Sequence, residues 1–145
     1  MVDIAIRDGT LIDGTGNGGH KTDILINDGK IDGVGNFPDI EATTNYDASG
    51  MVVTPGFIDI HNHSDFTLYV DGTAQSGIRQ GITTAVIGNC GHGPAPAPDS
   101  DLAKQVTIGV NKNWGIDFDW NTFDQYLDAL MVIGQSINIA PLVGH

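Results

Sequence analysis

The sequence predicts an α/β protein in two parts, and three observations support this prediction. Residues 1–53 are short runs of alternating apolar and polar residues, separated by turns rich in Gly and Asp. Residues 54–145 instead alternate apolar runs with helical patterns, which is typical of parallel βαβ units. The 145 residues, 40% of them hydrophobic, are also enough to form one ordinary globular core. We therefore expect a small β module followed by an α/β domain.

Four runs make up the expected β module: residues 2–6, 10–12, 22–26 and 30–34. The dipeptide Asp8-Gly9 and the tripeptide Asn27-Asp28-Gly29 are typical of hairpin turns, so antiparallel pairing is expected. Residues 14–19 match the pattern GxGxxG of dinucleotide-binding loops. That pattern requires a helix to follow, whereas residues 20–26 alternate like a strand. We therefore interpret the glycine-rich segment as a hairpin connection.

The α/β part begins after the break at Pro55-Gly56. Its expected strands are residues 57–60, 82–87 and 137–143. A short helix is expected over residues 73–80, with Thr73 as its cap and Gly81 at its end. A second helix is expected over residues 121–133, capped by Asn121 and ended by Gly134. An apolar stripe at helical spacing predicts which face of this helix packs in the core: Phe123, Tyr126, Leu127 and Leu130.

Composition and charge exclude several classes of function. The formal net charge is −12, and an acidic surface repels phosphate backbones, so nucleic acid is not an expected partner. No run of 18 apolar residues and no secretory signal pattern occur, so no membrane partner and a cytoplasmic location are expected. The single cysteine, Cys90, excludes an internal disulfide.

The segment His61-Asn62-His63 is the first candidate site. It follows an apolar strand, and side chains two positions apart on a strand point to the same side. Two neutral imidazoles so placed can bind one divalent cation such as Zn²⁺. Asp65 lies two residues further on and extends the same polar face if the strand persists. A pair of surface histidines in a loop is the alternative explanation.

The position of the pair favours the metal site. In parallel α/β folds, reactive side chains gather at the carboxyl ends of the strands. Cys90 follows the second expected strand and His145 follows the third. Each expected parallel strand therefore ends in a potential metal ligand, in a chain with only five histidines and one cysteine.

Three motifs resemble those of a known family. Residues 56–63, GFIDIHNH, are similar to the first-strand signature of the amidohydrolase superfamily. Residues 86–91, VIGNCG, and residues 137–145, INIAPLVGH, resemble its N-acyl-D-amino-acid deacylase (D-aminoacylase) branch. The resemblance covers essentially the whole chain. It implies that residues 54–145 form the first three strands of an incomplete (β/α)8 TIM-type barrel, preceded by a small β-sandwich module at residues 1–53.

The resemblance also implies roles for individual residues. His61 and His63 match the metal-binding histidines of the family. Cys90 matches a cysteine that, in this branch, takes the place that a carboxylated lysine occupies in hydantoinase-like and dihydroorotase-like relatives. A thiolate suits that place because it is anionic and binds Zn²⁺ strongly. Asp65 and His145 are expected to contact the substrate or to support the ligands.

Two further histidines, His20 and His92, lie outside the motifs. The family's catalytic aspartate and its remaining metal-binding histidines come from later strands, so we assign no catalytic residue here. A complete barrel needs roughly 250 residues. We therefore expect the chain to be the N-terminal part of a longer enzyme. By itself it is expected to be inactive, and prone to aggregation through its last strand.

The implied function is metal-dependent hydrolysis of an amide, in which water activated by one or two zinc ions deacylates N-acyl-D-amino acids. The implied partner is a small N-acyl amino acid substrate. Two alternatives stay open. A cyclic-amide hydrolase of the hydantoinase or dihydroorotase type would leave Cys90 free, and a non-catalytic scaffold or binding module would need no metal chemistry at all.

Overall fold

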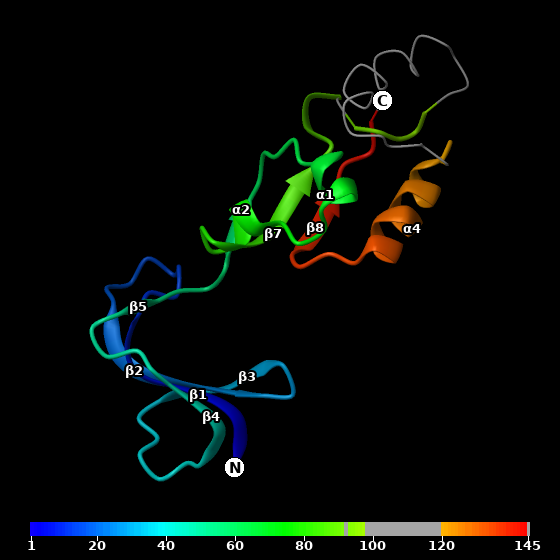
Figure 1. The fold of residues 1–145 in the computed structure, drawn as a ribbon. Coiled ribbons are helices and arrows are strands. Elements are labelled where there is room, and N and C mark those ends of the chain that lie inside the picture. Colours follow the sequence, from blue (N-terminus) through cyan, green and yellow to red (C-terminus); the bar gives the residue numbers. More distant parts are fainter. Residues whose placement is uncertain (92, 98–119, 145) are drawn as a thin grey trace. The chain divides into compact units, whose positions relative to one another are not determined.

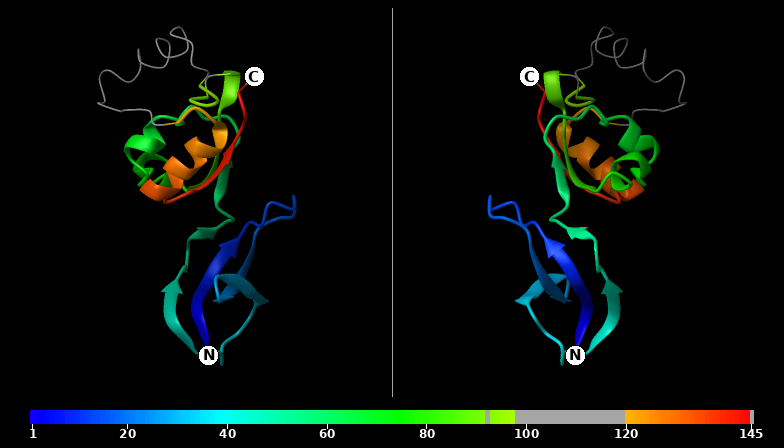
Figure 2. Two further views of the ribbon diagram at one scale, coloured as in Figure 1. Left: turned by 90° about the vertical axis from the view of Figure 1, so that its right-hand side faces the viewer. Right: turned by 90° about the vertical axis from the view of Figure 1, so that its left-hand side faces the viewer.

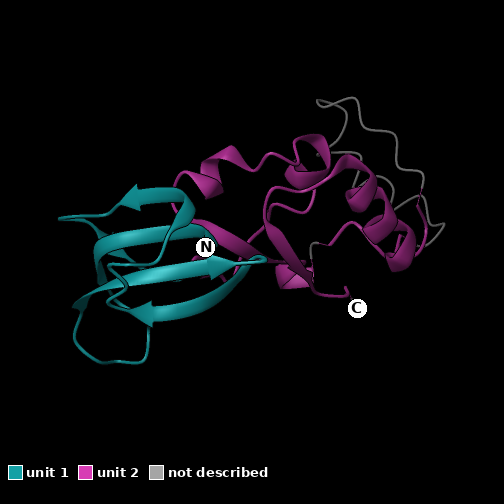
Figure 3. Ribbon diagram, turned by 90° about the horizontal axis from the view of Figure 1, so that it is seen from below, with its two compact units in different colours: residues 1–55 teal, residues 56–145 magenta. Residues whose placement is uncertain are grey.

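The computed structural model describes residues 1–91, 93–97 and 120–144. These residues belong to two compact units, Met1–Pro55 and Gly56–His145 (Figure 3). The first unit contains only β-strands, and the second combines a small parallel sheet with helices (Figure 1). No helix among the described residues is long and apolar enough to cross a membrane.

The first unit is one five-stranded sheet. Its strands are β1 (Val2–Leu11), β2 (His20–Asn27), β3 (Lys30–Gly35), β4 (Ala42–Asp47) and β5 (Val52–Val53). Strands β1, β2 and β3 pair antiparallel, but β4 and β5 both pair parallel to β1. The sheet is therefore mixed, and the expectation of a purely antiparallel module is wrong. The physical reason is that the chain after β3 crosses to the free edge of β1 instead of turning back on β3.

One expected turn is confirmed and another is wrong. Asp28 and Gly29 both have positive φ, +50° and +70°, as a two-residue hairpin turn requires, and they connect β2 to β3. Asp8 also has a positive φ, +57°, but β1 runs on through Gly9 with a shift of register. The dipeptide Asp8-Gly9 is therefore a β-bulge within one strand. A tertiary contact supports it, because the Asp8 N–H donates to the Asp23 carboxylate at 3.0 Å. The glycine-rich segment does connect the antiparallel strands β1 and β2.

The second unit contains a three-stranded parallel sheet, as the sequence predicts. Its strands are β6 (Phe57–Asp59), β7 (Ile82–Ile87) and β8 (Asn138–Pro141), in the order β6-β7-β8. The helices among its described residues are α1 (Thr67–Val70), α2 (Gln75–Ile78) and α4 (Phe123–Ile133), and the 3₁₀ turn η1 (Asn89–Gly91) follows β7. Because the strands are parallel, the segments that leave β6, β7 and β8 start at the same edge of the sheet.

Two helix starts differ from the prediction. Thr122, and not Asn121, caps α4, because Thr122 has the extended backbone of a cap and forms a reciprocal capping box with Gln125. Helix α2 begins later than expected, after Ala74, because the Thr73 hydroxyl hydrogen-bonds to Asp71 and is not available as a cap. Gly134 ends α4 as predicted, at a φ of +76°.

One hydrophobic core holds the second unit together. Helices α1 and α4 contact each other, and their buried residues form one cluster with those of β7; α4, in orange, lies on one side of the sheet (Figure 2). The buried residues of this core are Leu68, Ala85, Ile87, Ala95, Trp120, Tyr126 and Leu130. The predicted helical stripe is confirmed, since Tyr126 and Leu130 are buried in this core and Phe123 and Leu127 are partly buried against it. Each fully buried side chain of this size stabilises the fold by about 1.5–3 kcal/mol. The carboxyl end of β7, from which the candidate site extends, is thus anchored in packed structure.

Candidate metal centre

His61 and His63 lie in the loop directly after β6. The strand itself ends at Asp59, so the two histidines do not continue its alternation as expected. The loop nevertheless stays beside β7, because the Asn62 N–H donates to the Val86 carbonyl at 3.1 Å. The two imidazole rings contact edge to face, with centroids 5.3 Å apart and planes at 64°. Both side chains are exposed.

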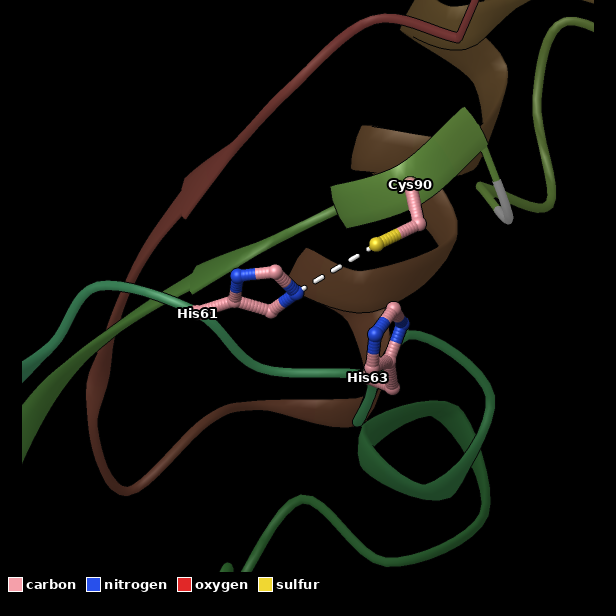
Figure 4. Close-up of side chains that lie close together, drawn as sticks. All are labelled: His61, His63 and Cys90. Carbon is pink, nitrogen blue, oxygen red and sulfur yellow. Dashed lines mark hydrogen bonds between the residues drawn. The ribbon is translucent and has the colours of Figure 1, made fainter.

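Cys90 comes from the turn that follows the neighbouring strand β7. Its Sγ lies 3.3 Å from Nε2 of His61, and His63 stands beside both (Figure 4). One ligand atom from each of the three residues lies within 4.8 Å of the others. The parallel pairing of β6 and β7 therefore brings together three side chains from two segments far apart in the sequence.

The turn that carries Cys90 has an unusual backbone. Cys90 has a φ of +58°, in the left-handed region, which costs a non-glycine residue about 1–2 kcal/mol. The preceding Gly88 has a φ of +79°, and a Cβ at this position would collide with the main-chain carbonyl of Leu142. The chain can therefore approach Leu142, which follows β8, only because residue 88 is glycine. Strained residues held in place by the surrounding fold are typical of functional sites.

The donor set fits a divalent metal ion. Zinc prefers combinations of imidazole nitrogen and thiolate sulfur, and its tetrahedral sites separate neighbouring ligand atoms by roughly 3.3–3.8 Å. The 3.3 Å between Cys90 and His61 already falls in this range. The 4.8 Å limit on the whole set requires only about 1 Å of side-chain adjustment, which exposed side chains make readily.

Asp65 is not one of the three clustered potential ligands. Its side chain is buried, whereas those of His61 and His63 are exposed, so the expected common polar face does not extend to it. Its main-chain carbonyl accepts a hydrogen bond of 3.0 Å from the hydroxyl of Tyr126 on α4. Burial raises the pKa of Tyr126 far above its usual range, and the nearby charge of Asp65 raises it further.

The remaining histidines do not join this cluster among the described residues. His20 is the exposed first residue of β2, in the other unit. His92 and His145 lie outside the described residues, so the expectation for His145 stays a prediction.

Two asparagines to which the sequence motifs assign no role adjoin the candidate ligands. Asn62 stands between the two histidines and Asn89 immediately precedes Cys90. The side-chain amide of Asn89 donates to the main-chain carbonyl of Asn62 at 3.1 Å. The only sequence signal for this contact is that an asparagine adjoins each group of ligands.

A parallel sheet that brings imidazole and thiol groups together after the carboxyl ends of adjacent strands agrees with the comparison with known proteins. The model of the amidohydrolase family matches residues 45–145. The chain belongs to the amidohydrolase family.

Several deacylases are similar to the chain over nearly all of its length. A D-aminoacylase of Alcaligenes xylosoxydans xylosoxydans is 36% identical, over 99% of this chain and 29% of the relative. An N-acyl-D-aspartate deacylase of the same organism is 34% identical, over 100% of this chain and 28% of the relative. The chain therefore spans somewhat less than a third of the length of these relatives.

Solved structures give the same result. An N-acyl-D-glutamate deacylase from Bordetella bronchiseptica, complexed with zinc and a phosphonate inhibitor, matches with a TM-score of 0.83. It is 36% identical, over 99% of this chain and 30% of that one. An L-hydantoinase from Arthrobacter aurescens matches more weakly, with a TM-score of 0.52 and 31% identity, over 60% of this chain and 20% of that one.

Proposed function

We propose that the chain supplies metal ligands to a metal-dependent amide hydrolase that deacylates N-acyl-D-amino acids. The observation that carries this proposal is the convergence of His61, His63 and Cys90 within 4.8 Å at the ends of two parallel strands. The similarity to three deacylases of N-acyl-D-amino acids supports the substrate class. The weaker match to an L-hydantoinase makes a cyclic-amide substrate the less favoured alternative.

The architecture we propose places each unit in a larger fold. Strands β6, β7 and β8 are the first three strands of a (β/α)8 TIM-type barrel, which begins near residue 54. The mixed sheet of residues 1–53 is one layer of a small β-sandwich. Three adjacent parallel strands, with helices in the connections between them, support the first assignment.

Zinc is the metal we propose. The similar deacylase structure from Bordetella bronchiseptica contains zinc. Another similar structure is that of a D-aminoacylase with a binuclear metal centre. A site with one or two zinc ions therefore agrees with these comparisons. A bound divalent cation supplies Lewis acidity toward an amide carbonyl and activates water at neutral pH.

Three exposed residues of the chain would bind the metal ion. His61 and His63 offer neutral nitrogen ligands, and the thiolate of Cys90 brings the negative charge that balances part of the cation's charge. All three side chains are exposed, so a substrate amide can reach the centre from solvent. Because these side chains serve as ligands, the proton that the leaving amine needs must come from another group.

Metal analysis of alanine variants tests the proposal. We expect His61→Ala, His63→Ala and Cys90→Ala each to lower the zinc content of the dialysed protein, and to abolish deacylation in the protein to which these residues belong. His20→Ala is the matched control, because it removes an exposed histidine of the other unit. If all three variants retain the zinc content and activity of the wild type, the assignment is wrong.

A further inference from the structure

The two segments that carry the potential ligands are joined directly by one side chain. Asn89 uses its amide nitrogen twice, donating to the carbonyl of Asn62 at 3.1 Å and to the carbonyl of Val86 at 2.8 Å. The Val86 carbonyl also accepts the main-chain N–H of Asn62 at 3.1 Å. Three hydrogen bonds thus form a closed set. They connect the loop of residues 60–64, here called the histidine loop, with the end of β7 and the turn that carries Cys90.

These bonds stand where regular strand pairing has stopped. The last paired residues of β6 and β7 are Asp59 and Ala85, so the histidine loop is beyond the ladder. Among the main-chain hydrogen bonds of the described residues, only the one from the Asn62 N–H to the Val86 carbonyl holds this loop beside β7. The hydrogen bonds of the Asn89 amide replace the strand pairing that is absent here. Asn89 is largely buried, with 9% of its surface exposed.

Hydrogen bonds between its own residues and Asp59 also stabilise the histidine loop. The Asn62 side chain donates to the Asp59 carboxylate at 2.6 Å and accepts the Ser64 N–H at 2.7 Å. The Asp59 carboxylate accepts the His61 N–H at 3.3 Å as well. The loop is therefore a preformed unit, and what Asn89 controls is the position of this unit relative to Cys90.

We propose that Asn89 is a positioning residue of the metal centre, which sets the distance between the His61 and His63 pair and the Cys90 thiol. This inference rests on the proposed metal site. Residues that orient ligands without binding the metal commonly contribute about tenfold to hundredfold to metal affinity. We expect an effect of this size, because His61 and His63 flank Asn62, to which Asn89 donates, and Cys90 directly follows Asn89.

The experiment compares Asn89→Ala with Asn138→Ala. Asn138 is a matched control, because its side-chain amide donates to the Thr83 carbonyl at 3.1 Å on the same sheet, toward the other end of β7. Two quantities are measured for each protein: the unfolding midpoint without metal, and the affinity for Co²⁺ followed by its thiolate charge-transfer and d–d absorption bands. Asn89→Asp is a second variant, with nearly the same shape but no amide donor.

We expect Asn89→Ala and Asn89→Asp to bind Co²⁺ about tenfold to hundredfold more weakly and to lose the thiolate band first. The metal-free unfolding midpoint of Asn89→Ala should stay close to that of Asn138→Ala. Equal Co²⁺ affinity and spectra in the Asn89 and Asn138 variants would overturn the inference. So would failure of both Asn89 variants to fold, since the role would then be structural. If the wild type binds no metal, the proposed function itself is wrong. Failure of the positioning role of Asn89 can therefore be distinguished from failure of the proposed function.

Discussion

The Sγ atom of Cys90 lies 3.3 Å from Nε2 of His61, although the two residues are 29 positions apart in the chain. Neither residue belongs to a strand, yet each follows one of two adjacent parallel strands. Parallel pairing places the carboxyl ends of both strands at the same edge, so the segments that leave them meet. The thiol and the imidazole are close enough to share one metal ion.

Metal should protect Cys90 from chemical modification. The chain has one cysteine and its side chain is exposed, so the reaction with a chromogenic disulfide reports this residue alone. We expect Zn²⁺ to slow the reaction by about tenfold or more, because the thiolate is both the nucleophile and the ligand. The His61→Ala/His63→Ala double variant should show much weaker protection. Equal reaction rates for the zinc-loaded and the metal-free wild type would instead favour the hydantoinase type of site.

Gly88→Ala should destabilise the second unit strongly. The added methyl group would need a φ of +79° and would overlap the main chain of Leu142, so both backbone strain and steric overlap act together. We expect a loss of about 3 kcal/mol in the free energy of unfolding, measured by urea denaturation. Gly91→Ala is the control, because it has a φ of +70° but open space around its Cβ, and it should cost about 1 kcal/mol. Similar losses in both variants would show that strain alone acts at Gly88.

Tyr126→Phe should remove a dependence of stability on alkaline pH. Burial and the charge of Asp65 raise the pKa of Tyr126 in the folded state above the value of about 10 expected for an unfolded chain. Above pH 10 the folded state therefore binds more protons than the unfolded state, so stability falls as pH rises. We expect the wild type to lose more unfolding free energy than Tyr126→Phe between pH 8 and pH 11.

At neutral pH the same substitution should cost only about 1 kcal/mol, the usual contribution of one hydrogen bond, here the one to the Asp65 carbonyl. Urea unfolding at both pH values measures the two effects. An identical alkaline slope in wild type and variant would contradict the assignment of the slope to Tyr126.

Asp23→Asn should reduce the acid sensitivity of the first unit. Burial acts to raise the pKa of Asp23, but hydrogen bonds from the N–H groups of Asp8 and Phe37 and from Arg7 outweigh it, so the pKa is lowered. The unfolded state then binds more protons, and the stability that the carboxylate contributes is lost as pH falls below about 4. Hydrogen exchange of residues 1–55 at pH 5 and pH 3, corrected for intrinsic rates, should show a smaller change in the variant. A change as large as in the wild type would place the acid sensitivity elsewhere.

Elements encoded by local sequence were predicted closely. Strand β7 spans residues 82–87 in both prediction and structure, because six residues of mostly β-branched and apolar character lie between Gly81 and Gly88. The turn at Asp28-Gly29 and the end of α4 at Gly134 were also predicted, since each depends on a residue that tolerates positive φ. In these places the physical determinant lies within a few residues of the feature.

Features that depend on distant contacts were missed. Asp8-Gly9 has the composition of a hairpin turn, but the carboxylate of Asp23 holds it as a bulge. Asn121 and Thr122 are both competent caps, and the extended backbone of Thr122 together with the position of Gln125 decides between them. The parallel pairing of β4 with β1 has no local signal, because it depends on the path of the connecting chain.

The candidate site divides in the same way. The sequence by itself determined which side chains could bind a metal, since His61, His63 and Cys90 each follow a predicted strand, and parallel strands end at one edge. Only the tertiary structure decided that the histidines lie beyond the end of β6 and that Asp65 is buried whereas they are exposed. It also decided that Asn89 joins the two ligand segments. Ligand chemistry is a property of single residues, whereas hydrogen bonding and burial depend on which distant segments the fold brings into contact.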